Sequence, residues 1–234
     1  MTIYERALEL VTDGAVIGLG SGRAAWAFVG LLGERVRAGH LRVQGVPTSV
    51  ETAHVAKQHG VPLAGLDEAG ELALTVDGAD EVDPDLDLIK GYGRALVREK
   101  VAAAASRALV ILVGEEKLVP RLGTRGRLPV EVVPFAVPLC ERRLVGLGLR
   151  PALWEQSGRP ALTDNGNHIL DCAIDPVPDA AQLEVTIRAI PGVVGTGLFL
   201  GMADTVLVGD RMDFRVIDER RRTRTSDSAM RSVP

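Results

Sequence analysis

Four ionisable side chains lie close together in the middle of the chain, and their types suit proton transfer. Asp77 and Asp80 lie in the segment TVDGADEVD, directly after a short apolar run. Lys90 precedes a Gly-Tyr-Gly segment that opens an alanine-rich helical pattern, and Glu99 lies about two turns inside that pattern. A carboxylate on an otherwise apolar helix face has a raised pKa and can act as a general base. A nearby ammonium can stabilise negative charge that develops on a substrate oxygen.

Each of these features also has a simpler interpretation when it is taken alone. The acidic segment could be a solvated turn, and Glu99 could pair with Arg98 or Lys100 on the surface. The segment lacks the ladder of ligands and the bidentate glutamate of an EF-hand. We predict no metal site, because no paired metal-ligand spacing appears among the four histidines, His40, His54, His59 and His168.

A glycine-rich segment near the N-terminus is a candidate anion site. Gly18-Leu-Gly-Ser-Gly22 ends an apolar run and opens a helical pattern, so backbone N–H groups and a helix N-terminus could meet a phosphate there. Ser21 adds a hydroxyl donor. Arg23 stands where the dinucleotide motif GxGxxG requires a glycine, and no GK[ST] follows as in a P-loop. A plain tight turn therefore remains an alternative.

The elements that must position these groups alternate along the first half of the chain. The apolar runs predict strands over 15–20, 41–46, 73–76, 88–89 and 108–113, and helical spacing predicts helices over 24–38, 50–59 and 96–106. Strands that are apolar on both faces and alternate with helices indicate a parallel sheet covered on both sides. Ligands bind beyond the carboxyl ends of such strands, where Asp77 and Asp80 are expected.

The pattern changes near residue 128. LPVEVVPFAVPLC contains three prolines, and we interpret it as a linker into a new strand and helix. Strand-like runs around two helical stretches, one of them over 180–190, predict a small α+β unit. The segments 198–208 and 214–217 are predicted to be strands that return to the first sheet. The basic, polar end ERRRTRTSDSAMRSVP is interpreted as a frayed terminus, with a nucleic-acid arm as the alternative.

Composition excludes several classes of protein. The chain has 234 residues, a net charge of −4 and 3% aromatic residues, so it has neither the basic footprint nor the stacking platforms expected of a nucleic-acid-binding protein. Two cysteines, Cys140 and Cys172, are too few for a disulfide framework. We find no signal peptide and no apolar run long enough to span a membrane, so we expect a cytoplasmic protein.

Taken together, the three chemical segments closely resemble the ribose-5-phosphate isomerase A family. The resemblance rests on GLGSG, TVDGADEVDPDLDLIKGYG and ALVREKVAAAAS, and TDNGNHILDC and IPGVVGTGLF agree with it. It extends over nearly the whole chain. It implies an α/β fold, with a Rossmann-like parallel-sheet catalytic domain over 1–127 and 199–234 and a smaller inserted α+β domain over 128–198.

The resemblance also implies an activity. Members of the family are aldose–ketose isomerases that interconvert D-ribose 5-phosphate and D-ribulose 5-phosphate, in the non-oxidative branch of the pentose phosphate pathway. They transfer protons through an enediolate with no metal and no cofactor. By position, Glu99 matches the general base and Asp77 the carboxylate that assists ring opening. Lys90 matches the cation that stabilises the oxyanion, with Asp80 beside it.

Further residues and a partner follow from the same resemblance. The expected partner is a small-molecule sugar phosphate, with no nucleic acid and no membrane, and the assembly is a homodimer or homotetramer. Lys117 matches a phosphate-binding lysine, and Gly91 and Gly93 would bring backbone N–H groups to the oxyanion. The implied substrate-binding residues are Ser21, Gly22, Arg23, Ala24, Gly78, Ala79, Gly91, Tyr92, Gly93 and Lys117.

The chain departs from the family pattern around the expected pocket. The first substrate loop usually reads GTGST, but here it reads Gly20-Ser-Gly-Arg-Ala24, and an N-terminal phosphate-binding lysine would fall before Met1. Tyr92 and Arg94 interrupt a loop that is normally all glycine. Arg23 could replace the lost phosphate ligands, because a guanidinium binds phosphate bidentately. The alternatives are a diverged paralogue acting on another sugar phosphate and a non-catalytic sugar-phosphate-binding module.

Overall fold

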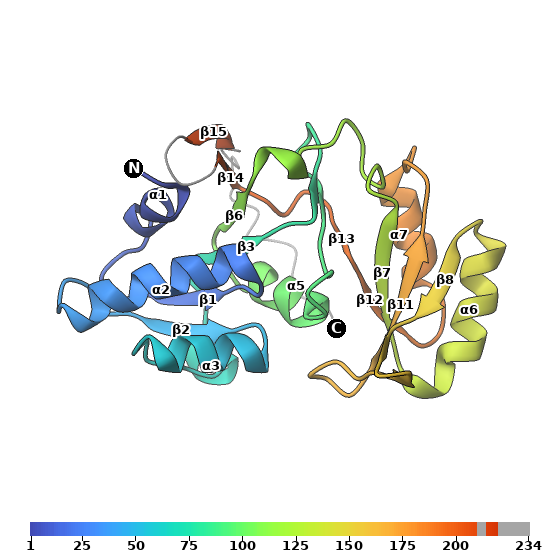
Figure 1. Cartoon of the computed structure of the whole chain (residues 1–234), viewed down its shortest axis with the longest axis horizontal. Helices are drawn as coiled ribbons and strands as arrows, with labels where there is room; N and C mark the ends of the chain where they lie inside the picture. The colour runs from blue at the N-terminus through green and yellow to red at the C-terminus, as the bar shows by residue number, and fades with distance from the viewer. Residues whose placement is uncertain (210–213, 220–234) are drawn as a thin grey trace, which may run out of the picture.

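A six-stranded sheet organises the larger part of the computed structural model, which describes residues 1–209 and 214–219 (Figure 1). Five strands run parallel, and β15 is antiparallel at one edge. All residues of β6 are buried, as expected of a parallel strand covered on both faces. The strands in spatial order are β15 (Phe214–Glu219), β14 (Thr205–Gly209), β6 (Leu109–Val113), β3 (Thr75–Gly78), β1 (Val16–Leu19) and β2 (Gln44–Pro47).

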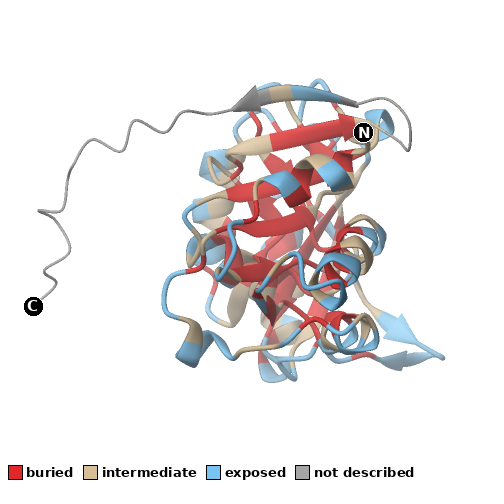
Figure 2. Cartoon of the chain, turned by 90° about the vertical axis from the view of Figure 1, so that its left-hand side faces the viewer, coloured by how far each residue is buried: buried red, intermediate tan, exposed pale blue. Residues whose placement is uncertain are grey.

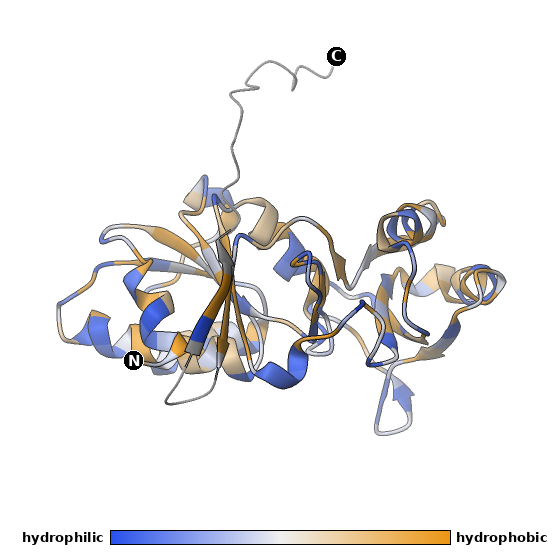
Figure 3. Cartoon of the chain, turned by 90° about the horizontal axis from the view of Figure 1, so that it is seen from above, coloured by the Kyte–Doolittle hydropathy of each residue, from blue (hydrophilic) through white to orange (hydrophobic). Residues whose placement is uncertain are grey.

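Helices cover both faces of this sheet. Phe28 and Leu32 of α2 pack in one apolar cluster with Ile17 of β1, whereas Ala103 of α5 packs with Ile111 in another. Figure 2 shows the buried strands stacked between partly exposed helices. Figure 3 shows helices that carry both hydrophilic and hydrophobic residues, as expected of elements with one face on a core. The helices of this part are α1 (Ile3–Glu9), α2 (Arg23–Arg37), α3 (Val50–Gln58), α4 (Leu66–Ala69) and α5 (Leu96–Ala104).

A separate antiparallel sheet stands beside the larger one, at the right of Figure 1. Helices α6 (Val137–Gly146) and α7 (Ala180–Arg188) bury Cys140, Leu144 and Ile187 in the apolar cluster of this sheet. A short hairpin of β9 (Glu155–Gln156) and β10 (Arg159–Pro160) extends from it. The four strands in spatial order are β12 (Val193–Thr196), β7 (Arg127–Val132), β11 (His168–Ala173) and β8 (Arg150–Leu153).

A small third sheet carries the chain between these two parts. Its strands are antiparallel, in the order β13 (Leu198–Phe199), β5 (Leu88–Ile89) and β4 (Glu81–Val82). Short 3-10 helices cover Glu115–Lys117 and Pro134–Ala136. Lys90 therefore follows a strand, β5, whose partners come from both halves of the sequence.

The predicted fold class, an α/β protein with a Rossmann-like sheet and a smaller α+β part, is confirmed by the mostly parallel sheet and the smaller antiparallel sheets. The predicted linker is wrong, because β7 occupies Arg127–Val132. The Pro129 carbonyl oxygen accepts a hydrogen bond from the Gly197 N–H, and β-branched valines on its C-terminal side favour an extended chain.

Two more boundaries differ from the prediction. The predicted strand over 198–208 is two strands, β13 and β14, in different sheets. The N-terminal helix α1 was not predicted at all. Most of the basic end of the chain lies outside the described residues, and so does the segment between β14 and β15. No helix among the described residues is long and apolar enough to cross a membrane.

Candidate active site

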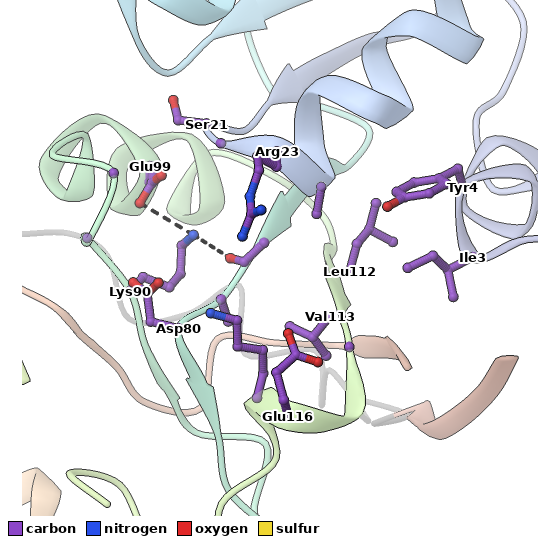
Figure 4. A pocket seen from close by; sticks show the side chains of 18 of the residues that line it. Ile3, Tyr4, Ser21, Arg23, Asp80, Lys90, Glu99, Leu112, Val113 and Glu116 are labelled. Atoms are coloured by element: carbon purple, nitrogen blue, oxygen red, sulfur yellow. Dashed lines mark hydrogen bonds and ion pairs between the residues drawn. The ribbon is translucent and has the colours of Figure 1, made fainter. Parts of the chain in front are cut away.

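A cavity of about 470 Å³ opens at the carboxyl edge of the parallel sheet (Figure 4). The segments that follow β1, β3 and β6 all reach it, as expected for a ligand site in an open α/β sheet. Lys90, directly after β5, and Glu99 of α5 also line the cavity. The cavity is lined by Ile3, Tyr4, Ser21, Gly22, Arg23, Ala24, Gly78, Ala79, Asp80, Lys90, Gly91, Gly93, Glu99, Leu112, Val113, Gly114, Glu116, Lys117 and Gly209.

The Lys90 ammonium is the centre of the site. Its Nζ donates to the Gly78 carbonyl oxygen at 2.6 Å and lies 2.9 Å from Asp77 Oδ2. Glu99 Oε2 is 3.4 Å from the same nitrogen, and Figure 4 shows the Lys90 side chain pointing toward Glu99. All three ionisable side chains are at most 3% exposed. Glu99 therefore does not pair with Arg98 or Lys100 on the surface, and the acidic segment is not a solvated turn at Asp77.

Burial and charge shift the ionisation of these groups in useful directions. Burial raises the pKa of Glu99, the Asp77 carboxylate adds to this effect and Lys90 opposes it, which leaves the pKa at about 8. Burial alone would lower the pKa of Lys90, but Asp77 and Glu99 outweigh it and raise that pKa above its usual value. Burial likewise raises the pKa of Asp77, against the pull of Lys90. The site thus holds a charged ammonium beside a carboxyl that exchanges its proton near neutral pH.

Local backbone structure explains why Asp77 reaches Lys90. Asp77 Oδ1 accepts hydrogen bonds from the backbone N–H groups of Ser21 at 3.1 Å and Gly78 at 2.8 Å. A Cβ at Gly20 would lie 2.2 Å from Asp77 Cγ, so only glycine allows the β1 loop to pass this close. Asp77 itself does not line the cavity; it lies behind Lys90.

The helix α5 and the loop before it present the other groups. We predicted Glu99 about two turns inside its helix, but α5 begins at Leu96 and Glu99 lies in the first turn. Gly91 has φ +105°, and a Cβ there would lie 2.9 Å from Leu96 Cβ, so the turn into the helix requires glycine. No protein acceptor among the described residues takes the N–H of Gly91 or Gly93, and both residues line the cavity.

Two further cations, Arg23 and Lys117, line the cavity. Arg23 starts α2, whose first turn has no side-chain cap, and Lys117 lies in the 3-10 helix after β6. Neither cation forms an ion pair with another residue of the described ranges, 1–209 and 214–219. A helix N-terminus with two such cations favours a phosphate. Glu116, which sequence reasoning did not select, adds a carboxylate to the same lining.

Two predicted substrate ligands are oriented differently from expectation. The Ser21 hydroxyl lies 2.8 Å from both Thr48 Oγ1 and Ser49 Oγ, inside a cluster of hydroxyls. Tyr92 does not line the cavity; its backbone N–H donates to Asp80 Oδ2 at 2.9 Å, and its hydroxyl donates to the Arg127 carbonyl oxygen at 3.0 Å. Of the fourteen predicted site residues, the lining therefore includes all except Asp77 and Tyr92.

The N-terminal helix is another part of the site that sequence reasoning missed. Ile3 and Tyr4 of α1 line the cavity, on the side away from Lys90 in Figure 4. A signal was available, because Thr2 and Glu5 form a capping box, which marks a helix start in a sequence. No group of three or more His, Cys, Asp or Glu side chains suited to a metal ion occurs within residues 1–209 and 214–219.

Comparison with known proteins gives a consistent result. The family model described as ribose 5-phosphate isomerase A (phosphoriboisomerase A) matches residues 44–213. Ribose-5-phosphate isomerase A of Gloeobacter violaceus is 50% identical over 217 residues, covering 92% of this chain and 94% of that protein. The protein of the same name from Roseiflexus castenholzii is 50% identical over 206 residues, covering 87% and 88%.

Solved structures agree with these sequence relatives. Ribose 5-phosphate isomerase A from Methanocaldococcus jannaschii has a TM-score of 0.87 and 40% identity, covering 92% of this chain and 96% of that one. A D-ribose-5-phosphate isomerase in complex with phospho-erythronic acid has a TM-score of 0.88 and 37% identity, covering 92% and 95%.

Proposed function

The chain belongs to the ribose-5-phosphate isomerase A family, and from this premise we propose how its own residues carry out the reaction. The protein is an aldose–ketose isomerase that interconverts ribose 5-phosphate and ribulose 5-phosphate. One observation carries the proposed mechanism: a buried ammonium, Lys90, lies between two buried carboxyl groups at the wall of the cavity.

Glu99 is the general base in this mechanism. It removes the proton from C2 of the open-chain aldose, and the C1 carbonyl oxygen gains negative charge as the enediolate forms. Glu99 then returns the proton to C1 while the proton of the C2 hydroxyl moves to the C1 oxygen, so the ketose forms with no net change in protons. A carboxyl with a pKa of about 8 suits both halves of this exchange, because it gains and loses a proton near neutral pH.

Lys90 and the loop after it stabilise the enediolate. The ammonium faces the cavity next to Glu99, and the N–H groups of Gly91 and Gly93 have no protein acceptor in the described chain. Donors that are already oriented stabilise developing oxyanions by about 3–4 kcal/mol each. This set of groups needs no metal or organic cofactor for the proton transfer, and we propose that the enzyme uses none.

Ring opening and substrate binding complete the assignment. Asp77 lies behind Lys90, so we propose that it assists ring opening indirectly. Asp77 orients the Lys90 ammonium and keeps it charged, and the ammonium acts on the sugar. Asp80 lines the cavity beside Lys90, and its carboxylate accepts hydrogen bonds from the sugar hydroxyls. The phosphate takes the other end, at the N-terminus of α2 with Arg23 and Lys117. Ser21, Gly22, Ala24, Gly78 and Ala79 form the walls between.

The bound ligand of the neighbouring isomerase suggests a probe. Phospho-erythronic acid has a phosphate at one end and a carboxylate at the other. We infer that it also fits this cavity, with its phosphate at Arg23 and Lys117 and its carboxylate at Lys90. The carboxylate would then occupy the place of the two enediolate oxygens.

The decisive experiment is an assay of purified protein with ribose 5-phosphate in the presence of a chelator. We expect ribulose 5-phosphate, and in deuterated water we expect deuterium from solvent in the product, because the enediolate exchanges its proton. A panel of five- and six-carbon aldose phosphates tests for a diverged specificity. A folded protein that binds ribose 5-phosphate without turnover would instead indicate a binding module and refute the mechanism.

The organisation around the site remains a proposal. We propose an inserted α+β domain over 128–198, because the strands of the four-stranded sheet all come from residues 127–196 and have their own apolar cluster. We also propose a homodimer or homotetramer in the cytoplasm. Sedimentation velocity and cell fractionation test these two statements, and a monomer at micromolar concentration would contradict the first.

A further inference from the structure

The loop Gly91–Arg94 has a backbone conformation that its sequence does not favour. Arg94 has φ +71°, in the left-handed region that glycine adopts freely and an arginine does not. The loop separates Lys90 from the helix that carries Glu99. It also forms a wall shared by two cavities, since Gly93 lines both the active-site cavity and a second one of about 360 Å³. A strained residue at such a place persists only when its surroundings hold it.

The Arg94 side chain supplies one of these restraints. Its Nη1 donates to Asp171 Oδ1 at 2.8 Å, and both side chains are only 18% exposed. The guanidinium also stacks over the ring of Trp154, 4.8 Å from its centroid. Asp171 belongs to β11 and Trp154 follows β8, so both partners belong to the four-stranded sheet. Arg94 therefore ties the active-site loop to the neighbouring part of the molecule.

Tyr92 supplies a second restraint from the same loop. Its hydroxyl donates to the Arg127 carbonyl oxygen at 3.0 Å, and the Arg127 guanidinium lies 3.7 Å from the centre of its ring. Arg127 Nε is in turn 3.7 Å from Asp171 Oδ1. Arg94 therefore contacts Asp171 directly, and Tyr92 is linked to Asp171 through Arg127.

The backbone N–H groups of this loop are the groups proposed to contact the substrate and Asp80. The Tyr92 N–H holds Asp80 Oδ2 at 2.9 Å, while the N–H groups of Gly91 and Gly93 are left for the substrate. We propose that Arg94 and Tyr92 are positioning residues, which fasten this loop to the four-stranded sheet so that its amides and Asp80 face the reacting end of the sugar. The inference rests on the proposed function, because it assigns a purpose to the fixed loop within that reaction.

The test separates catalysis from folding. Arg94→Gly relieves the backbone strain and removes the tether, so the fold is kept and the loop is released. We expect kcat for ribose 5-phosphate to fall about 10- to 100-fold, since small misplacements of oriented groups have effects of this size. The KM should change less than about 3-fold, because the Arg94 side chain contacts Asp171 and Trp154 rather than the proposed phosphate ligands, Arg23 and Lys117. Arg94→Lys keeps the charge and should retain more of kcat than Arg94→Gly.

Asp171→Asn weakens the same ion pair with Arg94 by a change in the four-stranded sheet. It should lower kcat in the same direction, and the double variant should lose less than the two single losses combined, because both changes remove the same ion pair between Arg94 and Asp171. Arg107→Ala is the matched control: it removes an exposed ion pair with Glu71 at 2.7 Å, remote from both cavities, and should leave kcat unchanged. Melting temperatures are measured for every variant.

Two results would overturn the inference. One is an unchanged kcat in both Arg94→Gly and Asp171→Asn, whatever their melting temperatures. The other is an additive double variant, which would show that the two residues act separately. If Arg94→Gly fails to fold, Asp171→Asn alone decides, since it leaves the loop sequence intact. Absence of turnover in the unmodified protein would refute the proposed function instead, so the two failures are distinguishable.

Discussion

Glu99 has a raised pKa although an ammonium, Lys90, lies beside it. In water an ammonium lowers the pKa of a carboxyl, yet here burial outweighs Lys90 and keeps the pKa at about 8. Lys90 stays charged because Asp77 also lies beside it. The residue types therefore suit the proposed proton transfer only in this buried arrangement, in which Asp77 helps to keep Lys90 charged and Glu99 has a raised pKa.

Replacement of the base tests its role directly. Glu99→Gln keeps the shape and removes the ionisable group, so kcat should fall by about 10²- to 10⁴-fold. Binding of phospho-erythronic acid, measured by calorimetry, should persist, because the phosphate ligands are unchanged. A variant with unaltered kcat would disprove the assignment.

The pH dependence follows from the same carboxyl. A general base acts when it is deprotonated, so kcat/KM should be constant above a pH of about 8 and fall as the pH drops below it, approaching tenfold per unit. Initial rates with ribose 5-phosphate between about pH 6 and about pH 10 measure this profile. A flat profile over that range would show that Glu99 is not the titrating base in the free enzyme.

Arg23 is the residue by which this chain departs most clearly from the family loop. Arg23→Ser restores a hydroxyl and removes a cation that faces the phosphate end. If Arg23 binds the phosphate, KM should rise about 10- to 100-fold, as expected for loss of a hydrogen bond to a charged group, with little change in kcat. Arg107→Ala serves again as the control. An unchanged KM would mean that Arg23 only completes the turn.

At the scale of the elements, the site is built from strand-to-helix connections. The start of α2 carries Arg23, the proposed phosphate ligand. Asp77 belongs to β3, Lys90 follows β5 and Glu99 belongs to α5. These connections meet because β1, β3 and β6 are adjacent and parallel, so their carboxyl ends share one edge. The close approach of the β1 loop to β3 depends on Gly20.

Gly20→Ala tests that close approach. The added methyl group would fall 2.2 Å from Asp77 Cγ, so the loop must shift and the protein should lose about 1–3 kcal/mol of unfolding free energy. Activity should also fall, because Asp77 would be displaced from Lys90. Gly146→Ala is the matched control: apart from its own helix backbone and chain neighbours, no atom of the described residues lies within 4 Å of its Cβ position at the end of α6. Equal melting temperatures for the two variants would contradict the packing argument.

At the scale of the whole molecule, the segment TDNGN joins the four-stranded sheet to helices α3 and α5 of the larger part. Glu131 is fully buried in β7, and its Oε1 accepts bonds from Thr163, Asn165 and Asn167. From there the segment reaches across to the first part of the fold, where Asp164 accepts from the Val50 N–H at 2.7 Å and Asn165 accepts from Arg98 at 2.8 Å. Arg98 directly precedes Glu99 in α5, so contacts from both parts of the molecule fix the position of this helix.

A ligand that spans the cavity should therefore stabilise the whole protein. At a concentration of about 100 times its dissociation constant, phospho-erythronic acid adds about 2.7 kcal/mol to the unfolding free energy. For a chain of this size the melting temperature should rise by about 5–10 °C. Arg23→Ser should show a smaller rise at the same concentration, and Glu99→Gln a similar one. No shift in the unmodified protein would contradict binding at this site.

The sequence by itself was sufficient for the fold class, the family and twelve of the residues that line the cavity. Apolar runs and glycine placement are local signals, and DGADEVD, LIKG and REK keep their spacing within one short stretch. Local signals were weaker at boundaries, because a proline-containing strand such as β7 resembles a linker until its neighbours supply the hydrogen bonds.

Only the tertiary structure decided how these residues meet. It placed Asp77 behind Lys90, turned Tyr92 toward Arg127, enclosed the Ser21 hydroxyl among other hydroxyls and brought α1 to the cavity. These contacts join segments that are far apart in the chain, and they depend on strand order and on the docking of two sheets. Periodicity and spacing describe one element at a time, so they do not determine which side of a loop a second element will cover.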